Sequence, residues 1–553
     1  MILARVSSKT PLTNAPSPMF ASKCAGMCRW VPAFLMLVAA AASAQIKQTA
    51  VYEQLHKGSE HDFIVVAMAD HGLALVRDTE KFEKGKKSWE VVFLDTALNE
   101  SWQSKFEVDH RMNLLGYDYY EGKLCLLFKE HDLNSRDINL VEFEPHSQTF
   151  VQHQFKPEAA IHFSHFSILK NKAILAGYLN TEPIVLMYDL QQESAKVVPG
   201  VFQKKVELMD VRVNSNATFN ILLVDRGAAI HKNLVLRTYD GEGVMLVEDI
   251  IPIDEGKSIL DAKSSALVRD ELMILGTWTQ GSNKQAAGLF SVVVDPFSNQ
   301  KINYYNLTDL NHFLDQFKPK KAARIRAHAE NRKSRGKAPD FRNFVSALKI
   351  VETNDGFVML GEVYEASNTY YNTRPGSPYY YPSPGFGSPY YGYPYGINSM
   401  PYRYGNPYGA TPYGSSGPSL SSDPLVVQAV VSVFDARGNL VGDHALKLEN
   451  TRSNTKEQVS DFNIADHQMI MAYRNEKEIT IRIDAPDGTN LHEEKLKPAL
   501  KNEHEEIRYE SQDNGGLRNW YGPYFYVYGF HTLKDNTTKE LRDVFYINKI
   551  EVR

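Results

Sequence analysis

Three short stretches of this chain come close to patterns that perform chemistry, and each departs from its pattern at a residue that the chemistry needs. His504 to Arg508 (HEEIR) begins like the helical zinc-binding pattern of metalloproteases, but arginine stands where the second histidine ligand belongs. Gly256 to Ser258 resembles the end of a phosphate-binding loop, yet Ile251 occupies the position of the earlier glycine. Asp484 to Asn490 (DAPDGTN) carries oxygen ligands without the alternating spacing of a calcium loop, which favours a turn between strands.

The histidines and cysteines also predict no reactive site. His162 and His165 are three residues apart in an apparent strand, so they should point to opposite faces and cannot share a metal ion. After residue 44 the one cysteine is Cys125, in the apolar run KLCLLF, which favours a buried, inert thiol over a nucleophile. We therefore expect no metal, no cofactor and no catalytic motif that local spacing could reveal.

A run of cations is the strongest charge feature. Lys318 to Arg342 contains ten basic and two acidic residues, within a chain that carries a formal net charge of −5. Such an arm could bind phosphate or carboxylate groups; the alternative is a solvated helix that offsets an acidic body. No aromatic side chain is interleaved through the run, which argues against binding of single-stranded nucleic acid. The candidate binding residues are Lys320, Lys321, Arg324, Arg326, Arg332, Lys333 and Arg335.

A segment rich in tyrosine, proline and glycine spans residues 369–423. Thirteen of the 30 tyrosines lie between Tyr370 and Tyr413, and the segment lacks the aliphatic residues that a core needs, so we expect disorder. Exposed tyrosines can stack on sugar rings or aromatic partners; the alternative is a tolerated loop expansion without specific function. The candidate contact residues are Tyr379, Tyr380, Tyr381, Tyr390, Tyr391, Tyr393 and Tyr395.

The first 44 residues read as a cleaved secretory signal. Lys23 and Arg29 precede an apolar run from Val31 to Ala42, and Ala42-Ser43-Ala44 forms a small-x-small cleavage site. The run is too short to span a membrane, and no second long apolar stretch follows. We expect an exported product, residues 45–553, in the periplasm or on the surface of a bacterium. With one cysteine it has no internal disulfide, so its hydrophobic core must stabilise the fold without a covalent cross-link.

An acidic residue recurs at the end of an apolar strand with a period near 50 residues once two irregular segments, 307–341 and 369–423, are set aside. The copies are Asp95, Glu144, Asp189, Asp240, Asp295, Asp435 and Asp484. Each unit can be divided into four short strands, with the acidic residue opening a turn after the third. This pattern resembles the β-propeller superfamily as a whole. The signatures of WD repeats, quinoprotein dehydrogenases and sialidases are absent.

The resemblance implies an all-β protein, a single propeller of eight blades of four antiparallel strands, with seven as the alternative. The N-terminal segment IKQTAVYEQL should complete the last blade and close the ring. Both irregular segments should leave the same face, one helical and one disordered. Leu310, Phe313, Leu314 and Phe317 have helical spacing, which predicts a helix capped by Thr308 and interrupted by Pro319.

We expect a non-catalytic binding or scaffolding propeller of the bacterial envelope, whose partner is an anionic envelope polymer or an envelope protein. The alternative is a propeller hydrolase or lyase acting on glycans at the mouth of the central channel. Propeller enzymes gather single residues from several blades, so local motifs neither support nor exclude this alternative.

Overall fold

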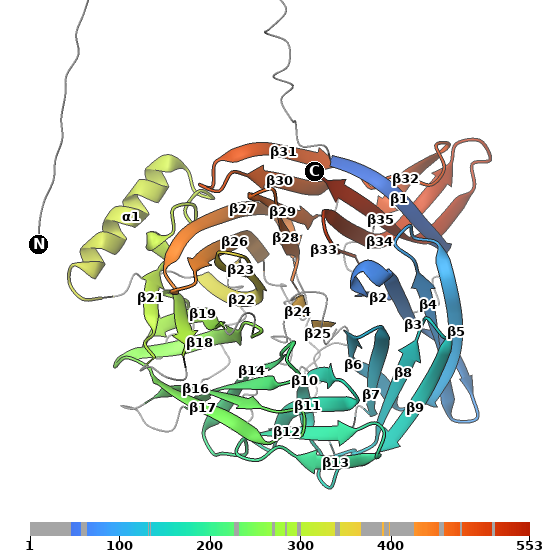
Figure 1. Ribbon diagram of the computed structural model, residues 1–553. Helices are drawn as coiled ribbons and strands as arrows, with labels where there is room; N and C mark the ends of the chain where they lie inside the picture. The colour runs from blue at the N-terminus through green and yellow to red at the C-terminus, as the bar shows by residue number, and fades with distance from the viewer. Residues whose placement is uncertain are drawn as a thin grey trace, which may run out of the picture. The chain divides into compact units, whose positions relative to one another are not determined.

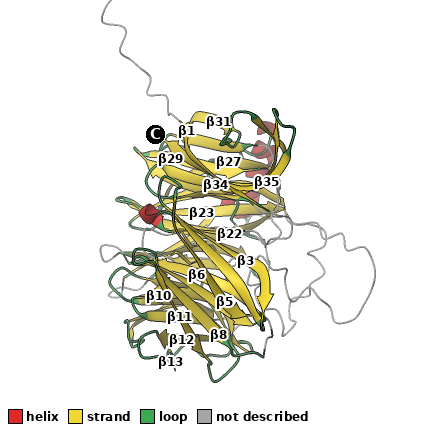
Figure 2. Cartoon of the chain, turned by 90° about the vertical axis from the view of Figure 1, so that its right-hand side faces the viewer, coloured by secondary structure: helices red, strands yellow, loops and turns green. Residues whose placement is uncertain are grey.

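The computed structural model describes residues 46–56, 63–130, 132, 134–225, 232–267, 271–281, 285–295, 300–337, 343–365, 390–391, 397–398, 425–452, 458–475, 478–510 and 515–553. Eight antiparallel sheets of four or five strands succeed one another around a central axis (Figure 1). Seen from the side, their strands run between the two faces of the ring (Figure 2). In the part of the chain so described, no helix is long and apolar enough to cross a membrane.

Blades 1 to 4 each use four consecutive strands, ordered from the centre outward. Blade 1 contains β2 (Ile64–Ala67), β3 (Leu73–Glu83), β4 (Lys86–Leu94) and β5 (Glu100–Asp109), with the short 3-10 helix η1 (Ala69–His71) after β2. Blade 2 contains β6 (Met112–Tyr120), β7 (Lys123–Glu130), β8 (Ile138–Glu144) and β9 (Thr149–Phe155). Blade 3 contains β10 (His162–Leu169), β11 (Lys172–Leu179), β12 (Glu182–Asp189) and β13 (Ser194–Val197). Blade 4 contains β14 (Val206–Val213), β15 (Phe219–Asp225), β16 (Asn233–Tyr239) and β17 (Met245–Pro252).

Blades 5 to 7 repeat this order around the two insertions. Blade 5 contains β18 (Lys257–Ser264), β19 (Leu272–Gln280), β20 (Gly288–Val294) and β21 (Asn303–Asn306). Blade 6 contains β22 (Asn343–Glu352), β23 (Gly356–Glu365), β26 (Leu425–Asp435) and β27 (Leu440–Arg452). Blade 7 contains β28 (Ser460–Ala465), β29 (Gln468–Arg474), β30 (Ile479–Asp484) and β31 (Asn490–Leu496). The two-residue strands β24 (Tyr390–Tyr391) and β25 (Ile397–Asn398) pair with each other.

Blade 8 joins the two ends of the chain. Its members are β32 (Glu505–Glu510), β33 (Gly516–Asn519), β34 (Tyr524–Asp535), β35 (Leu541–Val552) and β1 (Ile46–Leu55). Strand β1 pairs with β35 from Ile46 opposite Val552 to Leu55 opposite Val544, while β32 and β33 share the inner edge of β34. The prediction of eight blades closed by the N-terminal strand is confirmed.

The hydrophobic core is divided among the boundaries between blades. Eight clusters of buried side chains are present in the described part of the chain, and each combines residues of two neighbouring blades. One of them joins blade 8 to blade 1 through Trp520, Phe545, Leu75 and Val92. Because a blade is apolar on both faces, it can bury them only between two neighbours, which favours a closed ring.

The recurrent acidic residue is a turn residue in most of the repeats. Asp95 Oδ1 accepts hydrogen bonds from the N–H groups of Ala97 and Asn99, both at 2.8 Å. Asp189, Asp240 and Asp435 hold their turns in the same way. Glu144 stabilises its turn differently, through a 3.0 Å bond from the Ser147 hydroxyl, and Asp484 is an exception to the prediction.

Asp484 is fully buried and bonds to two other side chains instead. Its carboxylate lies 2.7 Å from Arg482 Nε and 3.3 Å from His444 Nδ1. Asp487 supports the turn in its place, through a 2.9 Å bond from the N–H of Thr489. The sequence pattern misplaced the turn residue because blade 7 carries a second aspartate three positions later.

The helix of the first insertion lies elsewhere than predicted. Leu307–Asp309 form the 3-10 helix η2, in which Asn306 and Asp309 cap each other, and the α-helix α1 spans Pro319–Lys333. The prediction of a helix over 310–317, capped by Thr308, is therefore wrong. Pro319 begins the helix rather than interrupting it, because the first helical position needs no N–H donor.

Candidate functional site

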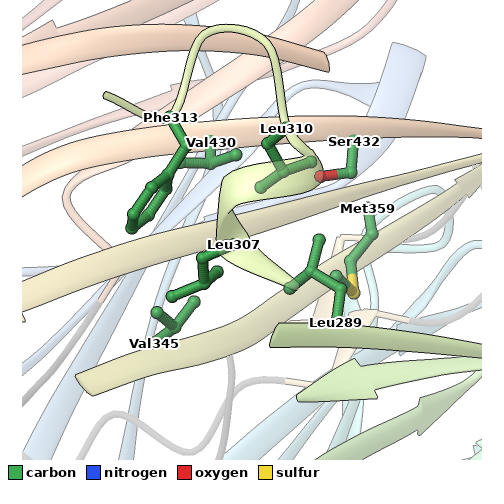
Figure 3. A pocket seen from close by; sticks show the side chains of 9 residues that line it. Leu289, Leu307, Leu310, Phe313, Val345, Met359, Val430 and Ser432 are labelled. Atoms are coloured by element: carbon green, nitrogen blue, oxygen red, sulfur yellow. The ribbon is translucent and has the colours of Figure 1, made fainter. Parts of the chain in front are cut away.

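The first insertion is anchored by apolar residues, most of which had suggested a helix. Leu307, Leu310, Phe313 and Leu314 are buried in the cluster between blades 5 and 6. A small pocket remains there, and its lining is apolar apart from Ser432 (Figure 3). The pocket is therefore a small gap in the packing of these apolar side chains, and it has few groups that could bind a polar ligand.

Helix α1 turns one stripe of side chains inward. Ala322 and Ile325 pack against the same cluster and Ala329 is buried. On this stripe Arg326 Nη2 donates to the carbonyl of Asn311 at 2.6 Å, and Lys333 Nζ lies 3.0 Å from Asp309 Oδ1. The helix is thus bound to the turn that precedes it, and it lies at the outer edge of the ring (Figure 1).

The seven predicted basic residues consequently divide into two groups. Arg326 and Lys333 make the internal contacts just described, and Arg332 is half-buried. Lys320, Arg324, Arg335 and His328 are exposed, as is Lys321, whose ammonium lies 4.1 Å from the centroid of the Phe317 ring. We call the four exposed cations, Lys320, Lys321, Arg324 and Arg335, the α1 surface. Lys320, Arg324 and His328 follow one another at intervals of four, which places them about 6 Å apart along one side of the helix.

Most of the predicted aromatic residues belong to the part of the chain that the structure does not describe. Tyr379, Tyr380, Tyr381, Tyr393 and Tyr395 lie outside the described residues, as does most of segment 369–423. Tyr390 and Tyr391 form β24, of which only the backbone is described. Their role as contact residues remains a prediction.

A set of acidic side chains on the innermost strands was missed by the sequence analysis. At four blade boundaries, one of these carboxylates accepts a hydrogen bond from a backbone N–H of the next blade. Asp118 Oδ2 accepts from Ile168 at 2.6 Å, Asp210 Oδ2 from Ser264 at 3.0 Å, Asp261 Oδ2 from Ala347 at 2.9 Å, and Asp461 Oδ2 from Asn519 at 2.9 Å. Their signal was an acidic residue inside an otherwise apolar first strand, as in GYDYY and LMDVRV.

Buried cations balance several of these carboxylates. Lys349 Nζ lies 2.8 Å from Asp461 Oδ1, and Lys263 Nζ lies 3.7 Å from Asp210 Oδ1. Burial raises the pKa of Asp261, an effect that Lys263 opposes. These groups hold blades together, and a carboxylate already bound to N–H and ammonium groups is poorly suited to general acid or base catalysis.

His165 differs from its prediction because a β-bulge interrupts β10. The register shifts between Phe163 and His165, so His162 lies opposite Tyr178 and His165 opposite Ala176. Tyr178 and Ala176 are two residues apart on β11, which puts both histidines on one face of the blade; the prediction of opposite faces is wrong. The sequence offered no sign of this bulge.

The environment of His165 is the arrangement on which the enzyme alternative would rest. Its Nδ1 lies 2.9 Å from Ser164 Oγ. Burial, reinforced by the nearby cation of Lys263 and opposed by Asp210, lowers the pKa of His165 to about 4. The imidazole is therefore neutral at pH 7. Because Ser164 is adjacent to His165 in the chain, the hydrogen bond between their side chains is a local contact that stabilises the bulge.

The stretches that approached catalytic patterns take structural positions. Glu505 begins strand β32 and binds Arg542 by two hydrogen bonds, so HEEIR does not form a zinc-binding helix. Gly256 occupies a turn with φ of 75°, and Lys257 Nζ bonds Asp254 Oδ2 at 2.7 Å.

Cys125 should resist alkylation in the folded protein. Its side chain is buried between blades 2 and 3, and burial raises the pKa of the thiol well above its usual value. Iodoacetamide at pH 8 should label it only after unfolding in urea, as judged by mass spectrometry. Rapid labelling of the native protein would contradict this packing.

Comparison with known proteins places the chain in no family. No family model matches it, and no curated protein matches its sequence. Among solved structures, polysaccharide lyase Uly1 is 10% identical with a TM-score of 0.40, covering 90% of this chain and 99% of the lyase. A second polysaccharide lyase, an ulvan lyase, is 8% identical with a TM-score of 0.38, covering 78% and 90%.

A further likeness is to the β-propeller domain of the Trilobed protease from Pyrococcus furiosus, at 9% identity and a TM-score of 0.33, covering 79% of this chain and 93% of that domain. Likenesses at this level carry no argument about activity. The chain is an eight-bladed propeller, as its own strand pairing shows.

Proposed function

We propose that this protein is an exported binding module of the bacterial envelope, and that its α1 surface binds an anionic envelope polymer. The observation that carries the proposal is the division of the cations on α1. Arg326 and Lys333 fix the helix to the turn that precedes it, while Lys320, Lys321 and Arg324 remain exposed on the helix. A helix held in place presents its charges without first losing conformational entropy, which favours binding.

The charge balance of the rest of the chain also supports this proposal. The chain is acidic overall although segment 318–342 is strongly basic, so a polyanion gains by binding at one place rather than anywhere on the ring. The groups around the channel weigh against the enzyme alternative, because Asp118, Asp210 and Asp461 already hold neighbouring blades together.

The test is a binding measurement with residues 45–553 and two immobilised polymers, polygalacturonate and long-chain polyphosphate, which separate carboxylate from phosphate recognition. Reversing two charges, in the variant Lys320→Glu/Arg324→Glu, should weaken binding roughly tenfold or more at low salt, since each cation near an anionic surface contributes about 1 kcal/mol. The affinity of the wild type should fall steeply as salt rises.

The matched control is Lys204→Glu/Lys205→Glu, which changes the net charge equally at two exposed lysines between blades 3 and 4. It should bind like the wild type. Equal weakening by both variants would show that only net charge matters, and failure of the wild type to bind either polymer would overturn the proposal. Turnover of a glycan by the wild type would instead favour the enzyme alternative.

A further inference from the structure

His312 lies where the first insertion meets blades 6 and 7. The residue follows η2, and its side chain is half-buried. Its Nδ1 lies 2.8 Å from Asp315 Oδ2 within the insertion, and its Nε2 lies 3.3 Å from the backbone carbonyl of Asp487 in blade 7. One imidazole therefore connects the base of the insertion to a turn of the ring.

Both groups that contact the imidazole of His312 are hydrogen-bond acceptors. A carboxylate and a backbone carbonyl can only accept, so both contacts form together only if both ring nitrogens carry a proton. A neutral imidazole has one N–H and would place a lone pair against the other oxygen. The geometry thus fits the imidazolium form.

The surroundings of the ring are acidic on each element that faces it. Asp315 belongs to its own segment, Asp487 belongs to blade 7, and the carboxylate of Asp443 on β27 accepts from the N–H groups of Asn311 and His312 at 2.7 and 2.8 Å. The charged group contributed by α1 is Arg326, which binds the carbonyl of Asn311. Partial burial by itself lowers the pKa of His312, but Asp315, Asp443 and the Asp487 carbonyl outweigh it, so the pKa is raised.

The space for the ring depends on Gly488. This glycine has φ of 84°, and a Cβ atom there would collide with Nε2 and Cδ2 of His312 and crowd the carbonyl of Asp443. The turn of blade 7 therefore accommodates the imidazole only because residue 488 lacks a side chain.

We infer that His312 is the positioning residue of the α1 surface, and that its protonated ring clamps the insertion onto the Asp487 turn of blade 7, beside the backbone hydrogen bond to Asp443 of blade 6. Loss of that proton loosens the insertion. The consequence for ligands rests on the proposed function: a loosened helix no longer presents Lys320, Lys321 and Arg324 in a fixed arrangement, so binding of the polyanion weakens.

The direction of the pH dependence follows from the raised pKa. The clamp contributes fully below the ordinary histidine pKa of about 6.5, and its contribution is lost as pH rises through the higher pKa of the folded protein. The opposite sign would require a lowered pKa.

The experiment is hydrogen–deuterium exchange of peptides covering residues 307–337, in residues 45–553, between pH 5.5 and 8.5, with rates corrected for intrinsic exchange. Protection of α1 in the wild type should fall several-fold as pH rises. His312→Gln should be weakly protected at every pH. Gly488→Ala should lower protection too, because it removes the space for the ring.

His328→Gln is the matched control, since His328 is an exposed histidine on α1 whose loss leaves the clamp intact. It should keep the pH step of the wild type. A wild type without a pH step, or a step that survives in His312→Gln, would overturn the clamp even if polyphosphate or polygalacturonate still binds. A normal pH step without binding of either polymer would overturn the proposed function and leave the clamp standing.

Discussion

Replacing Lys349 by methionine should destabilise the protein by about 3–5 kcal/mol, the usual cost of removing one partner of a buried ion pair. Lys349 is 4% exposed and Asp461 is 1% exposed, so the remaining carboxylate would keep its charge in a site that excludes water. Asp461 also accepts the N–H of Asn519, so one substitution weakens the contacts among blades 6, 7 and 8. The measurement is the shift of the urea midpoint of residues 45–553, followed by circular dichroism.

Two controls make this prediction specific. Lys447→Met removes an exposed lysine that lies 3.6 Å from Glu449, and it should change stability by less than about 1 kcal/mol. The double variant Lys349→Met/Asp461→Asn removes the stranded charge and should recover part of the loss. A single variant as stable as the wild type would show that Asp461 finds its compensation elsewhere.

Deleting β1 should have a still larger effect. Residues 46–55 supply the outermost strand of blade 8, and Tyr52 is buried in the cluster that joins blades 8 and 1. Without β1, the edge of β35 is exposed and the ion pair between Glu53 and Arg542 is lost. We expect the loss of most of the roughly 5–15 kcal/mol that stabilises an ordinary domain, seen as early unfolding or aggregation in a thermal scan.

Rescue by permutation separates closure from nonspecific damage. Ile46 lies opposite Val552 in the antiparallel pair, so residues 45–55 can be placed after Arg553 through a two-residue Asn-Gly turn that keeps this register. This permutant should recover the melting temperature of the wild type. A deletion variant that melts like the wild type, or a folded permutant that gains no stability over the deletion, would contradict a closing role for β1.

The sequence by itself determined the repeat and the way it closes. The strands of blade 4 can be predicted directly from the alternation of apolar runs and turn residues. In blades 1, 3, 4 and 6 the turn after the third strand is marked by an aspartate that binds neighbouring N–H groups, namely Asp95, Asp189, Asp240 and Asp435. The closing role of residues 46–55 was predictable because the last blade lacked one strand. All of these features depend on residues that are close together in the sequence, or on the number of strands in each repeat.

Contacts between distant residues had to come from the tertiary structure. Asp118 and Ile168 are 50 residues apart, and Asp261 and Ala347 are 86 apart. An aspartate inside a strand reveals no partner until the ring places the next blade beside it. The bulge at Ser164 is similar: one extra residue exchanges the face of His165, although the letters around it look like an unbroken strand.

The candidate site was determined partly by the sequence and partly by the tertiary structure. Composition alone revealed the basic segment, because charge needs no fold to be counted. Only the structure decided that Arg326 and Lys333 bind groups of the preceding turn while Lys320 and Arg324 extend into solvent, because that choice depends on which stripe of α1 packs against the ring. The structure likewise placed His312 between Asp315 and Asp487. These residues are 172 positions apart in the sequence and come close only because a turn of blade 7 lies beside the first insertion in the folded protein.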